Sequence, residues 1–237
     1  MTHKYPYKEW ELPSVTTICG DAVSQPWAAP WGAKMTVEWI RQNCPKPKRD
    51  HYLSGDDYAV SEEDLLDAKK NFREVSETAL AIGSDTHSAI EEWLVSGREP
   101  LDPRPEVLSA FVAFLEFWDA HKMTAIKVEH TVYGDCWAGT LDYYGWFNGK
   151  LYVIDFKTSK QHDKNTHGPQ IAAYRSRVNA KVDGCGILRL DKETGLPDWK
   201  DYSALYRKHL AEFNWMLELY MSRHPRIAKK AGWTKPF

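Results

Sequence analysis

The sequence lacks a long hydrophobic run. A membrane-spanning helix needs roughly 18 apolar residues in a row, and the most apolar segment, LSAFVAFLEFW (108–118), is shorter and carries Glu116. The opening stretch, MTHKYPYKEWELPS, has neither an apolar signal core nor an Arg-rich amphipathic pattern. We therefore expect no membrane partner, no targeting peptide and a cytoplasmic location.

Closely spaced cysteines are also missing. The four cysteines stand at positions 19, 44, 136 and 185 and form no CxxC pair. Zinc ribbons and iron–sulfur clusters need close ligand pairs, and disulfide frameworks are typical of short secreted chains. The spacing predicts four free thiols and no iron–sulfur cluster.

A strong charge of one sign is absent as well. The net charge of −2 and the pI of about 6.5 give no overall support to a nucleic-acid partner. Two segments are locally basic: residues 22–49 hold Glu38 as their only acid, and no acid follows Glu218. Such runs are equally well interpreted as solvated faces. The first run contains Trp27, Trp31 and Trp39, which suit either stacking of single-stranded bases or packing onto helices.

Helical patterns occupy most of the first half of the chain. Residues 1–60 read as irregular, apart from a short helix at 34–42. Ser61 and Asp64 form a capping box that opens a helix to about residue 82. The GSD at 83–85 predicts a break, and Gly97 closes the next helix. A further helix at 105–121 is expected to bury Leu108, Phe111, Leu115 and Trp118.

Strand patterns follow. Strands are predicted at 125–133, 137–147, 150–157 and 184–191, helices at 169–180 and 202–222, and turns at 148–149 and 193–195. This order indicates an α/β or α+β fold with one mixed central sheet. We expect a single domain over 1–237, with a helical N-terminal part (1–122), a central sheet and helix (123–200), and a C-terminal helix with a basic tail (201–237).

The Asn148-Gly149 pair sets the register of two strands. Asn-Gly between strand-like runs is the strongest short hairpin signal, and a two-residue loop there makes residue 147 face 150. Counting outward from the loop, Asp142 then faces Asp155, with Cβ atoms about 4.5–5.5 Å apart. Facing like charges destabilise a sheet, so the sequence predicts a compensating divalent cation, which Mg²⁺ can supply.

Lys157 lies two residues after Asp155 and therefore on the same side of the strand. An ammonium there can orient water or stabilise negative charge on phosphorus. The alternative is a surface Asp–Lys pair on a half-exposed strand. Leu151 and Val153 lie on the same side of the strand. This favours a strand face that packs into the core at Leu151 and Val153 and lines the site at Asp155 and Lys157.

Five motifs in one order resemble the PD-(D/E)xK nuclease superfamily in its RecB-like branch. GTLD (139–142) is similar to the motif of the first acid, VIDFK (153–157) to the D-x-K motif, and QIAAY (170–174) to Q-x-x-x-Y. GSDTHSAIEEWL (83–94) resembles the helix with a metal-binding histidine. LPSVTTI (12–18) resembles the opening of phage RecB-like exonucleases and of mitochondrial genome maintenance exonucleases.

The resemblance implies a restriction-endonuclease-like core and Mg²⁺- or Mn²⁺-dependent phosphodiester hydrolysis, with one or two ions. It implies His87, Asp142 and Asp155 as metal ligands, joined by the Phe156 carbonyl. It implies Lys157 as the catalytic lysine and Glu129 as a further acid. It also implies residues that support the site or contact DNA, namely Gln170, Tyr174, Thr158, Ser159 and Lys160.

Without the resemblance, several of these residues would be unremarkable. His87 shares a helical face with Ile90, Glu91 and Leu94, and Gln170 and Tyr174 would be routine helix surface. His162 and His167, in the polar loop after Lys157, are expected to be solvated or to contact phosphate.

The sequence thus predicts a metal-dependent DNA exonuclease acting on single-stranded DNA or DNA ends. The likeness to phage exonucleases indicates that the protein acts in recombination, replication or repair in a bacterial or phage-infected cytoplasm. A single-strand-binding or recombination protein is a possible partner. The rivals are a structure-specific or restriction-like endonuclease of the same fold and a catalytically inactive nucleic-acid-binding module. The sequence contains no HExxH motif, which argues against a zinc hydrolase.

Overall fold

The computed structural model describes residues 4–7, 10–23, 26, 28–44, 58–178 and 181–234. The chain forms two compact units, one made of Met1–Ser24 with Ile82–Phe237 and the other of Gln25–Ala81. Each unit is described by itself. No helix of the described residues is both long enough and apolar enough to cross a membrane.

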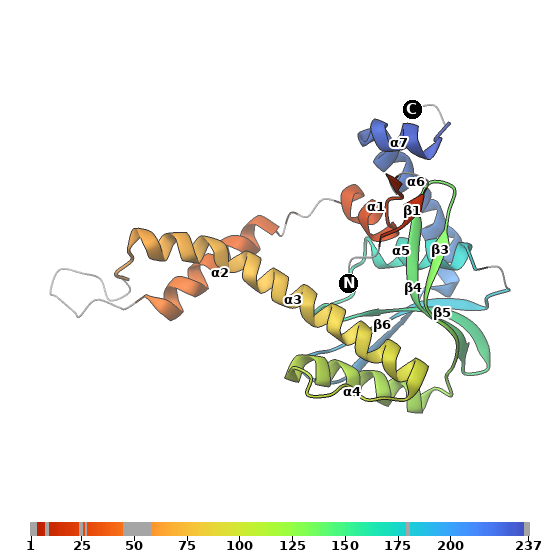
Figure 1. Cartoon of the computed structure of the whole chain (residues 1–237), viewed down its shortest axis with the longest axis horizontal. Coiled ribbons are helices and arrows are strands. Elements are labelled where there is room, and N and C mark those ends of the chain that lie inside the picture. The colour runs from red at the N-terminus through yellow and green to blue at the C-terminus, as the bar shows by residue number, and fades with distance from the viewer. Residues whose placement is uncertain are drawn as a thin grey trace. The chain divides into compact units, whose positions relative to one another are not determined.

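A five-stranded mixed sheet forms the centre of the larger unit (Figure 1). Its strands are β3 (Thr124–Tyr133), β4 (Ala138–Phe147), β5 (Lys150–Lys157), β6 (Gly184–Leu190) and β7 (Pro197–Asp201), in that spatial order. Only β5 and β6 pair in parallel. The predicted α/β class with a mixed sheet flanked by helices is confirmed, and β7 is a strand that the sequence reading missed.

The hairpin between β4 and β5 has the predicted register. Asn148 and Gly149 have φ values of 48° and 75°, the left-handed pair that a two-residue type I′ turn requires. The facing pairs run from Phe147 with Lys150 to Tyr143 with Ile154. The next residues along the two strands are Asp142 and Asp155.

Helices cover both faces of this sheet (Figure 1). One face is buried by α1 (Val15–Ala22), α5 (His167–Ser176) and α6 (Tyr206–Arg223), through a core that contains Ile18, Ile171 and Phe213. The other face is buried by α4 (Pro105–Ala120) and the last turns of α3 (Glu62–Ser96), through Ile90 and Phe114. The remaining elements are β1 (Pro6–Tyr7), β2 (Trp10–Glu11), η1 (Ser203–Leu205) and α7 (Pro225–Ala231).

The second unit is helical. It contains α2 (Ala28–Asn43) and the first part of α3, which are joined by a hydrogen bond from the Asn71 amide to the Met35 carbonyl, 3.0 Å. The predicted capping box is present, since Ser61 N donates to Asp64 Oδ2 at 2.8 Å and Asp64 N to Ser61 Oγ at 3.1 Å. Trp31 and Trp39 are half-buried on α2, whereas Trp27 lies outside the described residues.

Three helix predictions were wrong. Within the described part of residues 1–60, helix α1 was not predicted, and Ser14 caps it by accepting a hydrogen bond from Thr17 N at 3.0 Å. Pro30 is tolerated in the first turn of α2, where amides have no helical partner. The GSD at 83–85 does not break α3, because the helix continues past Gly83 to Ser96. The Thr86 hydroxyl also donates to the Ile82 carbonyl across this segment, at 2.8 Å.

Smaller differences concern faces and ends. Leu108 is 47% exposed, and Val107, Phe114 and Phe117 enter the core beside Phe111. Helix α5 begins two residues before the predicted Pro169, and α6 is followed by a separate α7. All four cysteines are free and buried, as predicted.

Candidate metal centre

Three elements of the larger unit bring metal-binding side chains together. His87 comes from α3, Glu129 from β3 and Asp142 from β4. One ligand atom of each lies within 4.8 Å of the others. Among the described residues this is the group of three that could share one ion, and all three were predicted as site residues.

His87 lies between the two carboxylates. Its Nδ1 is 3.3 Å from Asp142 Oδ1 and 3.8 Å from Glu129 Oε1. Burial lowers the pKa of His87, but the Asp142 and Glu129 carboxylates outweigh it and raise the pKa to about 10. Without a metal ion the imidazole is therefore protonated and serves as the counter-charge of the two acids.

Asp142 occupies an interruption in the sheet. On the β3 side the ladder passes over Asp142, from the pair Val128–Tyr143 to the pair His130–Leu141. On the β5 side its Oδ2 accepts a hydrogen bond from the Phe156 amide at 2.5 Å. Burial alone would raise the pKa of Asp142, but His87 and Lys157 and this amide lower it below its usual value. The carboxylate is thus held ionised inside the sheet.

Glu129 has an uncommon backbone conformation. Its φ is 45°, in the left-handed region, which costs a residue with a side chain on the order of 1 kcal/mol or more and is concentrated at functional sites. The residue lies in β3 opposite the interruption at Asp142. This bend accompanies the approach of the Glu129 carboxylate to His87.

Asp155 and Lys157 form a buried ion pair beside this group. The Lys157 Nζ is 2.6 Å from Asp155 Oδ2, and their side chains are 23% and 3% exposed. Burial raises the pKa of Asp155 to about 6, helped by Asp142 and opposed by Lys157. Burial lowers the pKa of Lys157, but Asp155 and Asp142 outweigh it and hold it above its usual value. The lysine is therefore a fixed cation facing both acids.

The arrangement differs in detail from the predicted ligand set. Asp155 is not within the group of three that lies inside 4.8 Å, because its Oδ2 faces Lys157. Phe156 enters through its amide, and the ligand role of its carbonyl stays a prediction. Glu129, inferred as a further acid, is the residue that joins His87 and Asp142.

Gln170 and Tyr174 are both buried on α5, and their support of the site stays a prediction. Gln170 Nε2 donates to the Tyr174 hydroxyl at 3.0 Å and to Thr16 Oγ1 at 3.2 Å. The contact with Thr16 joins α5 to α1, and with them the QIAAY and LPSVTTI stretches. A Cβ at Gly139 would lie 2.4 Å from the Tyr174 ring, so the glycine lets α5 approach β4.

Sequence reasoning missed Tyr5 and Thr16. The Tyr5 hydroxyl is buried and hydrogen-bonded to Thr140 Oγ1 at 3.0 Å, two residues before Asp142. Burial raises the pKa of Tyr5, as do Glu129 and Asp142 more weakly. Thr16 lies within the LPSVTTI stretch, but the stretch does not indicate its contact with Gln170. The Tyr5 contact joins segments 135 positions apart, which no local pattern encodes.

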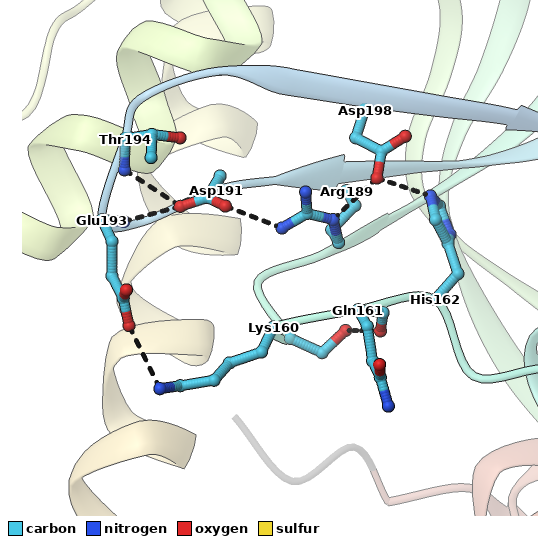
Figure 2. A network of polar contacts seen from close by, with 9 residues as sticks. Lys160, Gln161, His162, Arg189, Asp191, Glu193, Thr194 and Asp198 are labelled. Atoms are coloured by element: carbon cyan, nitrogen blue, oxygen red, sulfur yellow. Dashed lines mark hydrogen bonds and ion pairs between the residues drawn. The ribbon is translucent and has the colours of Figure 1, made fainter.

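The loop after Lys157 is tethered to the turn between β6 and β7 (Figure 2). Figure 2 shows Lys160 in contact with Glu193 of this turn and His162 in contact with Asp198 at the start of β7. The two N–O distances are 3.3 Å each. Arg189 contacts Asp198 and Asp191, each at 2.9 Å. Ser159 donates within the loop, to the Gln161 carbonyl, and Thr158 lies against Gly83. DNA contact by Thr158, Ser159 and Lys160 stays a prediction.

The two loop histidines are largely buried and not solvated, and the other expectation, contact with phosphate, stays a prediction. His167 is 5% exposed and begins α5, and the side chain of His162 is 12% exposed. His167 Nδ1 accepts from Asp163 N at 3.1 Å. Burial, reinforced by Lys157, lowers the pKa of His167 to about 4, so the ring is neutral at physiological pH.

Comparison with known proteins adds no relative. No protein-family model matches the chain, and no curated protein sequence matches it.

Proposed function

We propose that this chain is a metal-dependent deoxyribonuclease of the RecB-like PD-(D/E)xK type, acting as an exonuclease on single-stranded DNA or DNA ends. The observation that carries the proposal is the group of His87, Glu129 and Asp142 within 4.8 Å, next to the buried Asp155–Lys157 pair. Like carboxylates gathered in a buried place are costly unless cations compensate them.

The donor set fits Mg²⁺ or Mn²⁺. Both ions favour carboxylate oxygens, which Glu129 and Asp142 would supply, and an imidazole such as His87 is a good ligand for transition metals. Asp142 is buried and the side chains of Glu129 and His87 are partly exposed, at 8%, 15% and 28% respectively, so the group is partly shielded from solvent. The described cysteines are buried and scattered, and none joins this group.

The residues divide the work of phosphodiester hydrolysis. A bound divalent ion would supply Lewis acidity and a more acidic water. Lys157, held charged by Asp155 and Asp142, would stabilise negative charge on the attacked phosphate. The Phe156 amide and Gln170–Tyr174 pair would keep Asp142 and β5 in position.

Activity against matched substrates tests the proposal. End-labelled linear single-stranded and duplex DNA and covalently closed circles are incubated with Mg²⁺, Mn²⁺ or EDTA. We expect digestion of the linear forms only with metal, and a loss of about 100-fold or more in D142N and K157A. E92Q, which neutralises an exposed acid on α3, is the control and should digest as wild type.

The rival readings give different results in the same assay. Cleavage of closed circles would favour a structure-specific or restriction-like endonuclease. Binding without metal-dependent cleavage by the wild type would favour an inactive nucleic-acid-binding module. Full metal-dependent digestion by D142N or K157A would remove the assignment of the site.

A further inference from the structure

The N-terminal segment packs against the first residues of β4, just before the candidate ligand Asp142. Its strands β1 and β2 pair in an antiparallel ladder, and the Leu12 amide extends the pairing by donating to the Tyr5 carbonyl at 2.8 Å. Tyr5, Leu12 and Ala138 form a small buried apolar cluster. The segment is therefore packed into the larger unit at the start of β4.

Two hydrogen bonds connect this segment with β4, one on either side of Gly139. The Ala138 amide donates to the Pro13 carbonyl at 3.1 Å. The Tyr5 hydroxyl is hydrogen-bonded to Thr140 Oγ1 at 3.0 Å, and the two residues are 5% and 7% exposed. A buried hydroxyl that loses its partner is costly, so these contacts restrain β4 at Ala138 and Thr140.

Thr140 belongs to the regular part of the β3–β4 ladder directly beside the metal centre. It faces Thr131 of β3, and two residues away from this pair the ladder passes over both Glu129 and Asp142. Ladder pairing therefore does not restrain these two candidate ligands themselves. Their geometry depends on the backbone that precedes and follows the interruption, which Thr140 helps to hold in place.

Tyr5 is also close enough to the two acids to feel their charge. Burial is the main cause of the raised pKa of Tyr5, and the Glu129 and Asp142 carboxylates raise it further. The phenol is therefore protonated and brings no further negative charge to the carboxylates. A phenylalanine would fill almost the same space but could not bond to Thr140, so the role of the hydroxyl can be tested separately from that of the ring.

We propose that Tyr5 is a positioning residue of the metal centre, which acts through Thr140 on the placement of Asp142. The inference rests on the proposed function, because this centre is the proposed nuclease site. Groups that orient the ligands of a metal commonly set its affinity. Because Tyr5 acts through Thr140, loss of its hydroxyl should weaken metal binding by about the net contribution of one hydrogen bond, which corresponds to about fivefold in Kd.

The Mn²⁺ affinity of matched variants tests the proposal. Metal-free proteins are titrated with Mn²⁺ where each is fully folded, and the electron paramagnetic resonance signal of free Mn²⁺ gives the Kd. Y5F and T140V should each bind about fivefold more weakly, and Y5F/T140V no more weakly than either, since all three lack the same hydrogen bond. T140S keeps the hydroxyl and should bind as wild type. Y133F, at an exposed tyrosine at the end of β3, is the control and should also bind as wild type.

A merely structural role of Tyr5 gives a different result. It predicts that Y5F loses stability to urea in EDTA while its Mn²⁺ Kd stays that of wild type, and this outcome would overturn the inference. Equal Kd values for T140V and T140S would overturn it as well. If Y5F does not fold, the comparison of T140V with T140S decides alone.

Hydrolysis of linear DNA separates the inference from the proposed function. Y5F should need about fivefold more Mn²⁺ for its half-maximal rate and should reach the wild-type rate at saturating Mn²⁺, because Tyr5 positions a ligand and takes no part in the reaction. A wild type that binds Mn²⁺ but digests no DNA would refute the nuclease, while weaker Mn²⁺ binding by Y5F would still support the positioning role. Absence of Mn²⁺ binding by the wild type would overturn the inference.

Discussion

At the scale of single residues, the candidate centre is a set of buried charges that compensate one another incompletely. Glu129, Asp142 and Asp155 carry three negative charges, while protonated His87 and Lys157 carry two positive ones. Burial raises the pKa of Asp155 to about 6, and the neighbouring Asp142 carboxylate adds to this shift. A site with buried acids in excess is suited to a cation from solution.

The Asp155–Lys157 pair yields a stability prediction. K157M leaves the Asp155 carboxylate buried without its cation, which should lower the free energy of unfolding by about 3 kcal/mol or more. The double variant D155N/K157M should recover part of the loss, because no buried charge is then left alone. Urea unfolding at pH 7 in EDTA measures both.

A surface pair on the neighbouring loop is the control. Lys160 and Glu193 are 84% and 65% exposed, so K160M should change stability by less than about 1 kcal/mol. Equal effects of K157M and K160M would contradict the description of Lys157 as a buried counter-charge.

His167 gives a pH dependence of known sign. Its pKa in the folded protein, about 4, lies below the value of about 6.5 in an unfolded chain. The unfolded state therefore binds the extra proton first as the pH falls, and the folded state loses stability between pH 6.5 and 4, by about 2–3 kcal/mol in total. H167N keeps an acceptor for Asp163 N but does not titrate, so its stability should fall less over this range.

Comparing the stability of wild type with that of H167N removes the contribution that other titrating groups make to the pH dependence. Asp155 has the opposite sign, because its folded pKa is raised and protonation below about 6 favours the folded state. Parallel stability curves for wild type and H167N between pH 7 and 4 would show that His167 is not buried in its neutral form.

At the scale of secondary-structure elements, short-range signals predicted the centre of the fold well. The Asn148-Gly149 turn determined the register from 147 with 150 to 143 with 154, because turn geometry and alternation are local. The break predicted at Gly83 was wrong, because a glycine costs a helix only about 1 kcal/mol relative to alanine, which tertiary contacts can offset.

The candidate site was only partly accessible to the same reasoning. The acids Asp142 and Asp155 followed from the hairpin, but the approach of His87 and Glu129 depends on how α3 and β3 pack, which no local pattern encodes. Those two residues came from the family resemblance. Tyr5 and Thr16 were missed, because their contacts join the N-terminal segment to β4 and α5.

The hairpin turn can be tested by paired glycine substitutions. Gly149 has a φ of 75°, so G149A should destabilise the protein by about 1 kcal/mol through backbone strain. Gly20 lies inside α1 and a Cβ there meets no atom within 4 Å, so G20A should stabilise by about 0.5–1 kcal/mol. Thermal unfolding measures the two shifts, and a change of the same sign in both would contradict the turn geometry.

At the scale of the whole molecule, the site belongs entirely to the larger compact unit, Met1–Ser24 with Ile82–Phe237. The three candidate ligand residues come from α3, β3 and β4, so their side chains meet only when these elements have assembled. The division of the chain falls within the predicted helical N-terminal part, 1–122, whereas the sheet, α5, α6 and α7 all lie in one unit.

The central claim is that one divalent ion is shared by His87, Glu129 and Asp142, and calorimetric titration tests it most directly. Mn²⁺ is titrated into metal-free wild type, E129Q, D142N and the control E92Q at one pH. We predict saturable binding by wild type and E92Q, and at least about tenfold weaker binding by E129Q and D142N. Equal Mn²⁺ affinity in all four proteins, or no Mn²⁺ binding by the wild type, would contradict it.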